Sequence, residues 1–474
     1  MYTQSLTMNK AAMEKSTLFR VLRSRHICGL FERGFTRSAT RLTKKDLYKD
    51  KKIPVFDYSK IHLENKRLYV FGAAFHGALG LRDLLKPKDH RQKLITRIHR
   101  PVRHKLFHDL NPQDITAGHG FSLVGVKRKD QNHPALFGCG LNETSQLGYQ
   151  AARVGAPLER LISPVGISLP VRIDKPEILA LAAGRGHSVI SIKHEGLITW
   201  GDNSSGQCGR FVVEDEKYFG SHFAHKISSF GLREDNEVIE ISSRFDITVC
   251  VTRSGKVIAF GDNQKGQLGR GRMTVNTWNT NDSLGGDIEG VRIVKVSTNG
   301  SSVLACSDNG ELFGWGCNEM GHLDPSNISR IYYQPVFIKI PDKIGKVVDV
   351  AVGNSASFII NEHGDVYVWG QGHTLGLGPS NLHVKVPTLM PPPLFGRNDY
   401  NTDVKVTSIV AGFDHAAGIN SVGDLFTWGL NSSGCLGLGK LEKQPFPLKV
   451  SLNSSVVKVA LGVDHTVVLA KGGF

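Results

Sequence analysis

The sequence lacks the apolar runs of a membrane-spanning protein, because no stretch approaches the ~20 consecutive apolar residues that cross a bilayer. It also lacks a Cys-x-x-Cys pair, and its seven cysteines are scattered along 474 residues. An odd, scattered set predicts reduced, buried thiols rather than a disulfide framework or a zinc site. No uninterrupted apolar segment of secretory type is present, which argues against a secretory signal.

Catalytic constellations are missing as well, since no nucleophile–base pair, carboxylate pair or complete cofactor fingerprint appears. Residues 434–440 match most of a phosphate-binding P-loop, but Leu441 replaces the hydroxyl residue that would bind magnesium. His104 and His108 have the spacing of metal ligands on a helix, yet no third ligand is evident and Pro101 favours a loop. We therefore expect a protein that is not an enzyme and holds neither a cofactor nor a metal.

Glycine, by contrast, is abundant at 52 residues, and its positions repeat. A glycine follows an aromatic residue, or once a cysteine, at Gly72, Gly140, Gly201, Gly261, Gly316, Gly370 and Gly429. Eight residues after each of these, a second turn position is occupied by glycine in every copy except one, which has Asp324. Upstream lies a second pattern, Gly-x-x-His or a variant of it, centred on Gly118, Gly184, Ser243, Thr298, Gly353, Gly412 and Gly462.

Each pair of patterns predicts a β-hairpin, because two alternating strands flank a glycine-containing turn. The first copy has only the second half of the hairpin, and the last copy, which begins at Val459, has only the first half. Pairing the C-terminal strand with the N-terminal one closes the repeats into a ring. We predict an all-β fold, a seven-bladed β-propeller in which both ends share one blade. Loss of residues 459–474 should then unfold the whole ring.

The repeated histidines and tryptophans are interpreted as scaffold. His187, His415 and His465 occupy the fourth place of Gly-x-x-His, and a catalytic histidine is not expected to recur with structural symmetry. They are predicted to lock a strand to the neighbouring blade. The other copies have Phe121, Asp246, Ser301 and Ala356 at this place, and the tryptophans at the strand ends, Trp200, Trp315, Trp369 and Trp428, are predicted to be core wedges.

Residues 1–45 carry ten Lys and Arg against two acids and are rich in Ser and Thr. Basic, hydroxyl-rich and amphipathic composition is typical of a mitochondrial presequence, with a processing site near Phe35 and Thr36. The alternative is a disordered basic tail that contacts nucleic acid or carries a nuclear address, which Lys44-Lys45 favours. The predicted division is a disordered presequence over 1–45, a linker over 46–65 and the propeller over 66–474.

Gly-x-x-His-Ser followed by Trp-Gly-x-Asn-x-x-Gly-Gln-Leu-Gly, repeated from about residue 66 to 470, resembles the regulator of chromosome condensation propellers. With its arginine-rich presequence, its basic first insertion and the proline-rich segment 390–396, the chain looks like the mitochondrial member of that family. The resemblance implies a matrix protein, with possible inner-membrane association. It implies a non-catalytic role with mitochondrial rRNA and large-subunit assembly proteins in ribosome assembly and translation, or alternatively nucleotide exchange on a dynamin-like fusion GTPase.

Function is expected in the long connections that the repeat does not explain. The connection 81–117 is predicted to contact RNA phosphate, with Phe107 or an arginine available to stack on an unpaired base. The basic residues assigned to this contact are Arg91, Lys93, Arg97, Arg100, Arg103 and Lys105. The alternative for this segment is a solvated loop that is partly a blade strand.

The connection 210–242 carries Glu214, Asp215 and Glu216, followed by Tyr218 and Phe219. An acidic, aromatic wedge of this kind would compete with phosphate for the lysine and magnesium of a GTPase. A generic adaptor at a membrane is the third hypothesis, since many propellers bind partners without chemistry.

Overall fold

A computed structural model describes residues 66–85, 93–127, 134–153, 156–216, 225–227, 236–277, 284–324, 326–327 and 330–472. The predicted presequence 1–45 and linker 46–65 lie outside the described residues, as do Arg91, Tyr218 and Phe219. Among the helices of the described part, none is long and apolar enough to cross a membrane.

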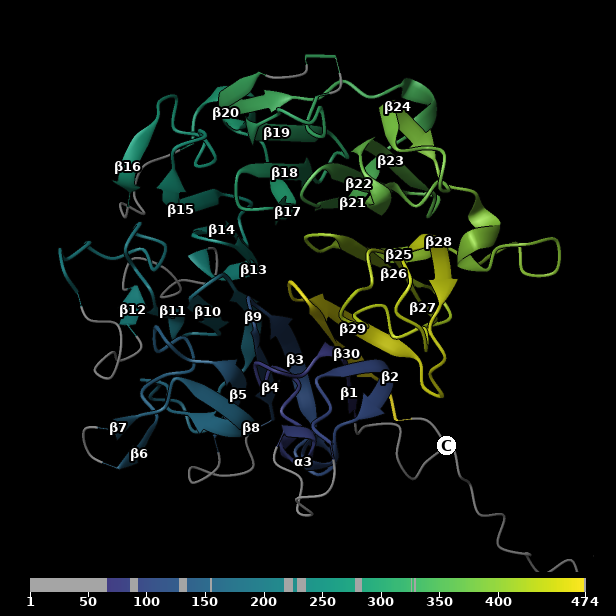
Figure 1. The fold of residues 1–474 in the computed structure, drawn as a ribbon. Coiled ribbons are helices and arrows are strands. Elements are labelled where there is room, and N and C mark those ends of the chain that lie inside the picture. The colour runs from purple at the N-terminus through teal and green to yellow at the C-terminus, as the bar shows by residue number, and fades with distance from the viewer. Residues whose placement is uncertain are drawn as a thin grey trace, which may run out of the picture. The chain divides into compact units, whose positions relative to one another are not determined.

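The described residues form seven four-stranded sheets arranged as blades around a central axis (Figure 1). This arrangement confirms the predicted all-β, seven-bladed propeller. From the axis outward, the blades comprise β3 (Pro112–Ala117), β4 (Phe121–Val126), β5 (Leu136–Leu141) and β8 (Arg160–Ile167); β9 (Ile178–Ala183), β10 (His187–Ile192), β11 (Gly196–Gly201) and β12 (His225–Ile227); and β13 (Val238–Arg244), β14 (Ile247–Thr252), β15 (Val257–Asn263) and β16 (Thr274–Thr277).

The next blades in chain order have the same pattern. They comprise β17 (Ile293–Thr298), β18 (Ser302–Ser307), β19 (Leu312–Cys317) and β20 (Ile331–Phe337); β21 (Val347–Val352), β22 (Ala356–Asn361), β23 (Val366–Gln371) and β24 (His383–Leu389); and β25 (Val406–Ala411), β26 (His415–Asn420), β27 (Leu425–Gly429) and β28 (Gln444–Lys449). Outside the blades lie the hairpin of β6 (Ala151–Arg153) and β7 (Ala156–Pro157) and the short helices α3 (Arg82–Leu85), η2 (Lys105–His108), η4 (Gly286–Ile288), η5 (Asp342–Ile344), η6 (His373–Leu375) and η7 (Pro392–Phe395).

The remaining blade, which we call the closing blade, is built from both ends of the described chain. Its strands from the axis outward are β29 (Val456–Leu461), β30 (His465–Ala470), β1 (Arg67–Ala73) and β2 (Arg97–Arg103). Strand β1 pairs with β30 in an unbroken antiparallel register from Arg67 opposite Ala470 to Gly72 opposite His465. The shared blade that the mismatched repeat ends predict is therefore confirmed.

Tryptophans join neighbouring blades, as predicted for core wedges. The four tryptophans at strand ends are at most 1% exposed. The indole N–H of Trp200 donates to the carbonyl of Gln146 at 2.8 Å, and that of Trp315 donates to the carbonyl of Gln267 at 2.9 Å. Each acceptor lies in the turn of the preceding blade, and Trp428 likewise donates to the carbonyl of Thr374 at 2.7 Å, whereas the indole N–H of Trp369 has no partner among the described residues.

Glycine is required after each aromatic residue, because another backbone segment lies too close to leave room for a Cβ atom. Gly201 has φ of +97°, and a Cβ on it would lie 2.4 Å from the carbonyl oxygen of Gly186. Two residues later, Asn203 closes the turn, since its Oδ1 accepts from the N–H of Cys208 at 3.0 Å and its Nδ2 donates to the carbonyl of Arg210 at 3.2 Å. The conserved spacing within the repeat therefore follows from a turn held by one amide side chain.

The predicted position of the Gly-x-x-His pattern is wrong by one residue in two copies, where the structure places it one residue later. In β13, Arg244 pairs with Ile247 where other blades have the glycine and the histidine. In the next blade, the N–H of Asn299 donates to the carbonyl of Ser302, as that of Gly184 does to His187. Arg244 and Asn299 thus replace the glycine, and Ile247 and Ser302 replace the histidine, which corrects the assignment of Ser243, Thr298, Asp246 and Ser301.

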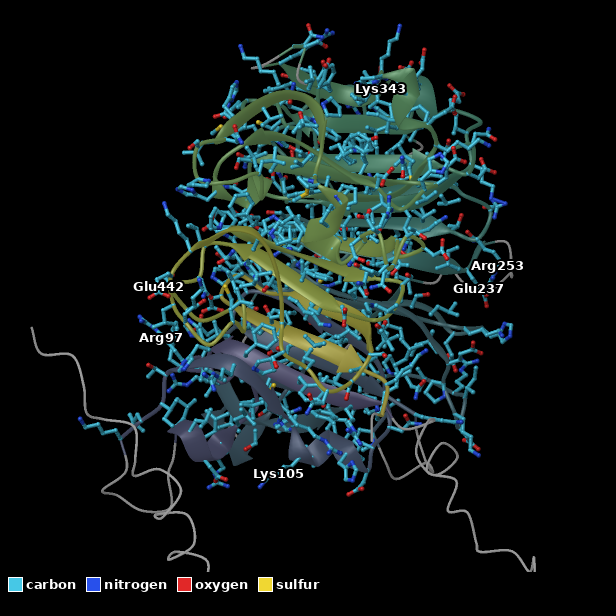
Figure 2. The ribbon with its side chains drawn as sticks, turned by 90° about the vertical axis from the view of Figure 1, so that its right-hand side faces the viewer. Arg97, Lys105, Glu237, Arg253, Lys343 and Glu442 are labelled. Carbon is cyan, nitrogen blue, oxygen red and sulfur yellow. The ribbon has the colours of Figure 1, made fainter. Side chains whose placement is uncertain are left out.

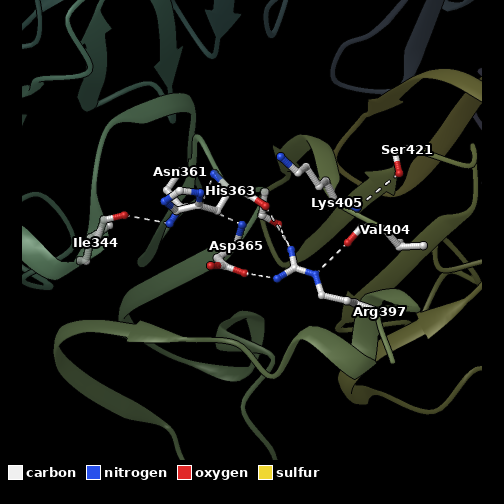
Figure 3. Close-up of polar contacts among 9 residues, drawn as sticks. Ile344, Asn361, His363, Asp365, Arg397, Val404, Lys405 and Ser421 are labelled. Atoms are coloured by element: carbon white, nitrogen blue, oxygen red, sulfur yellow. Dashed lines mark hydrogen bonds and ion pairs between the residues drawn. The ribbon is translucent and has the colours of Figure 1, made fainter. Parts of the chain in front are cut away.

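The proline-rich segment 390–396 and the turn that follows it, whose Arg397 contacts are drawn in Figure 3, fix one blade to the next. Phe395 in η7 is buried, with its ring 5.6 Å from that of Phe426 and 5.9 Å from that of Trp428. The next turn is held by Arg397, which donates to Asp365 Oδ1 at 2.6 Å and to the carbonyl of Val404 at 2.8 Å. These contacts join the loop after β24 to the hairpin between β22 and β23.

Two of the three predicted histidine locks are present. His187 Nε2 lies 2.9 Å from Thr248 Oγ1 and His465 Nε2 lies 2.9 Å from Ser122 Oγ, each on the following blade. His415 is the exception, because its Nε2 has no hydrogen-bond partner among the described residues. Burial lowers the pKa of His187 and of His415 to about 3, so both imidazoles are neutral at neutral pH.

The buried, neutral His187 makes the stability of the ring depend on pH. Its pKa is about 3 when folded and ~6.5 when unfolded, so its contribution is fully present above pH ~6.5 and is lost as the pH falls toward 3. Between pH 7 and pH 5, the free energy of unfolding should fall in the wild type. In His187→Gln we expect this fall to be smaller by roughly 2 kcal/mol. Denaturant midpoints at the two pH values measure this. Exposed His363→Gln is the control, and equal losses in all three proteins would contradict the prediction.

The closing blade predicts an all-or-none effect of truncation. Removal of residues 459–474 takes away β30 and half of β29, leaving β1 without its inner partner strand. We expect loss of the cooperative thermal transition, measured by near-ultraviolet circular dichroism, rather than a small decrease in Tm. Removal of residues 471–474 alone spares both strands and is the matched control. A cooperative transition retained by the longer truncation would refute closure as the source of stability.

Candidate nucleic-acid interface

The predicted RNA-binding segment contributes the outermost strand of the closing blade. Strand β2 pairs with β1 only at its two ends, with Val102 opposite Val70 and Ile98 opposite Gly72, so the residues between them bulge outward. Pro101 lies in this bulge, which suits an edge strand because proline has no N–H to donate. The bulge keeps the side chains of His99 and Arg100 exposed.

The P-loop look-alike packs directly against this bulge. The N–H of Gly439 donates to the carbonyl of His99 at 2.6 Å, and Gly434 and Gly439 have φ of +83° and +81°. The segment 434–440 is therefore the turn of the neighbouring repeat, which confirms the interpretation from sequence. A Cβ on Gly439 would lie 3.0 Å from Arg100 Nε, and the exposed Lys440 is the next residue in the chain.

We call the cations of residues 93–105 and of the adjoining turn the basic edge. It comprises Lys93, Arg97, Arg100, Arg103, Lys105, Lys440 and Lys443. Figure 2 shows Arg97 and Lys105 on the lower side of the ring, with the acidic Glu442 near Arg97. Among the described residues, no carboxylate forms an ion pair with any of these side chains, so their charge is available to a partner.

The structure separates the predicted residues into exposed and structural ones. Arg97, Arg100 and Lys105 are exposed, whereas Arg103 is half-buried and its Nη2 donates to His108 Nδ1. Phe107 is 1% exposed, and its ring packs edge-on against Phe137. The prediction that Phe107 stacks on an unpaired base is therefore wrong, because its ring belongs to the core under η2.

The histidines of the same segment do not form a metal site. His104 is buried, its Nε2 lies 3.2 Å from the carbonyl oxygen of Gly80, and burial lowers its pKa. His108 instead receives the hydrogen bond from Arg103. No group of three metal-ligating side chains occurs within the described ranges.

Buried thiols are confirmed for the described cysteines, which are Cys139, Cys208, Cys250, Cys306, Cys317 and Cys435. Burial raises the pKa of each thiol, that of Cys139 to about 12, so the thiolate needed for nucleophilic attack is scarce.

The acidic segment after β11 is only partly available to a partner. Glu216 forms an ion pair with Arg210 at 2.8 Å, and both side chains are largely buried. Glu214 and Asp215 remain exposed, the latter in a turn with φ of +58°. Apolar side chains accompany them, since Phe211 is 65% and Val213 is 49% exposed. The sequence prediction did not single out these two residues, although they belong to a short apolar run, 211–213, directly before the acidic residues.

Comparison with known proteins defines the family. The regulator of chromosome condensation (RCC1) repeat matches residues 309–360 and 422–469, and a second description of that repeat matches 347–374 and 406–435. The RCC1-like G exchanging factor-like protein of mouse is 37% identical over 429 residues, which cover 88% of this chain and 90% of that protein. The crystal structure of human WBSCR16 matches with a TM-score of 0.79 and 36% identity, covering 86% of this chain and 100% of that one.

Yeast RCC1 bound to Kap60 shares the fold, with a TM-score of 0.68 at 19% identity over 88% of this chain and 91% of that one. Fold and sequence together define a seven-bladed propeller built from RCC1 repeats. The chain belongs to the RCC1-like propeller family.

Proposed function

We propose that the protein is a non-catalytic factor that binds mitochondrial rRNA during assembly of the large ribosomal subunit. The observation that carries this proposal is the basic edge, where exposed cations from two neighbouring blades adjoin without carboxylate partners among the described residues. A row of unpaired Lys and Arg side chains attracts a phosphate backbone and releases its counterions. The basic, hydroxyl-rich composition of residues 1–45 supports import into the mitochondrial matrix.

Structured RNA suits this surface better than a free nucleotide does. The basic edge runs along an exposed strand and an adjoining turn rather than into a pocket, so it offers several separate phosphate contacts. The exposed apolar side chains of Leu94 and Leu106 lie within the same segment, at 61% and 45% exposure. Their position is compatible with a ribosomal assembly protein bound beside the RNA.

The double substitution Arg97→Glu and Arg100→Glu tests the basic edge. We expect weaker binding to large-subunit rRNA and a salt dependence whose logarithmic slope is smaller by about 2, because roughly one phosphate contact is lost per arginine. Lys343→Glu with Lys346→Glu is the control, since it makes the same change of charge on η5 and the loop that follows, far from Lys105 in Figure 2. Filter binding over a range of salt concentrations measures both variants.

Crosslinking and sequencing in cells tests the identity of the RNA. We expect the full chain to recover mitochondrial large-subunit rRNA, and a chain without residues 1–45 to stay outside mitochondria and recover none. Recovery of no mitochondrial RNA above background by the imported full chain would overturn the proposal.

Nucleotide exchange on a dynamin-like GTPase is the second candidate, supported by the name of the mouse and human relatives, RCC1-like G exchanging factor-like protein. The exposed residues of the acidic segment, Phe211 and Glu214, offer the apolar and acidic groups of a wedge. Glu216 is less suited to this role, because it already pairs with Arg210.

Release of labelled GDP from the purified GTPase tests this candidate. We expect the wild type to accelerate release, and Glu214→Gln with Asp215→Asn to remove most of the acceleration while leaving the ion pair of Glu216 intact. Glu289→Gln with Asp399→Asn removes the same charge from exposed positions elsewhere and should have no effect. Unchanged release with the wild-type protein would exclude exchange activity on that GTPase.

A further inference from the structure

The innermost strands of all seven blades in the described chain enclose a polar cavity of about 300 Å³ along the axis. At one end of this cavity, each inner strand finishes at an equivalent position of the repeat. The residues at this position are Gly118, Gly184, Arg244, Asn299, Gly353, Gly412 and Gly462. Five copies therefore have no side chain there, and one carries the longest basic side chain available.

The side chain of Arg244 crosses the axis to the far side of the ring. Its Nη2 donates to the carbonyl of Ala411 at 3.0 Å, and its Nη1 donates to the carbonyl of Leu461 at 3.4 Å. Arg244 lines the axial cavity and also a small pocket that includes His119 and Val463. The guanidinium thus forms the partition that closes the cavity at this end.

The positive charge of Arg244 has no counterion among the described residues. Both of its hydrogen-bond partners are neutral carbonyls, and burial lowers the pKa of its guanidinium to about 10, which still leaves it charged at neutral pH. A partly buried cation without an anion loses some of its hydration uncompensated, and this cost is relieved when an anion binds. The remaining N–H groups of the guanidinium are donors for such an anion.

Two serine hydroxyls line the same cavity as the guanidinium. Ser242 precedes Arg244 by two residues on β13, and its Oγ accepts from the N–H of Thr298 at 3.0 Å. On the adjacent β17, Ser297 Oγ accepts from the N–H of Val352 at 3.0 Å. Both hydroxyls line the axial cavity, and neither O–H proton has an acceptor within the described ranges. Each is therefore available to a ligand in the cavity.

The carboxylates of the cavity lie at its other end and have partners of their own. Lys458 pairs with Asp114, and Lys295 Nζ lies 3.1 Å from Glu240 Oε2. Asp349 accepts from the N–H of Ile409 at 3.1 Å and of Val350 at 3.0 Å, and burial raises its pKa to about 6. Glu240 precedes Arg244 by four residues, ~13 Å along an extended strand, so these acids do not neutralise the guanidinium.

We propose that Arg244, Ser242 and Ser297 bind one tetrahedral oxyanion in the axial cavity, either free phosphate or the phosphate group of a small monoester. The guanidinium supplies a charge-assisted, forked donor, and the two hydroxyls supply further donors from neighbouring blades. Such a ligand joins the blade of β13 to that of β17 at the centre of the ring. The site is independent of the basic edge and of the acidic segment.

Calorimetric titration of the full chain with inorganic phosphate, in a buffer without chloride or sulfate, tests the site. We expect saturable binding of one phosphate per chain and an affinity about tenfold or more lower in Arg244→Met, because a charged hydrogen bond is lost. Lys343→Met, on the exposed η5, should bind as the wild type does. A parallel titration with ribose 5-phosphate separates the sources, since a site for monoesters binds both ligands and a site for the free ion binds inorganic phosphate alone.

Two further variants keep the test decisive if Arg244→Met does not fold. Arg244→Lys retains the charge and should keep measurable but weaker binding, and Ser242→Ala with Ser297→Ala should weaken binding without removing the guanidinium. Absence of saturable phosphate binding to the folded wild type would overturn the proposal. So would equal affinities in the wild type and all folded variants, because Arg244 would then be only a structural tie between β13, β25 and β29.

Discussion

The pairing of β1 with β30 is the contact on which the rest of the ring depends. A blade of this propeller is apolar on both faces, and each face is covered only by a neighbouring blade. Opening the ring at one place therefore exposes two such faces and unpaired strand edges to water. Six residue pairs, from Arg67 with Ala470 to Gly72 with His465, prevent this. Closure thus links the stability of every blade to residues at both ends of the described chain.

Ring symmetry also decides which residues serve the scaffold. A side chain that recurs at one place in the repeat, such as His187 or Trp200, makes a similar contact with the adjacent blade in most of its copies. Function is expected where a copy departs from the pattern, because the departure has no scaffold explanation. Arg244 in place of a glycine is such a departure, and so is the charged insertion that contributes β2.

Much of the fold could be predicted from the sequence, because the turn glycines and asparagines have strict conformational requirements that leave a regular spacing. The closing blade followed from the incomplete first and last copies. The register of two inner strands could not be predicted, since Arg244 and Asn299 replace the residue that marks it. The burial of Phe107 and the contact of Gly439 with His99 could not be predicted either, because both depend on packing between segments far apart in sequence.

The two groups of cations differ in what they select, because their surroundings differ. The basic edge is exposed, so each charge interacts weakly, is screened by salt and becomes effective only in number. Such a surface favours a polyanion that contacts several side chains at once. Arg244 is a single cation held in a narrow polar cavity, where screening is slight and the geometry is fixed by two carbonyls. Arg244 therefore favours one small anion, and the rigid ring of blades around the cavity limits the size of the anion that can bind.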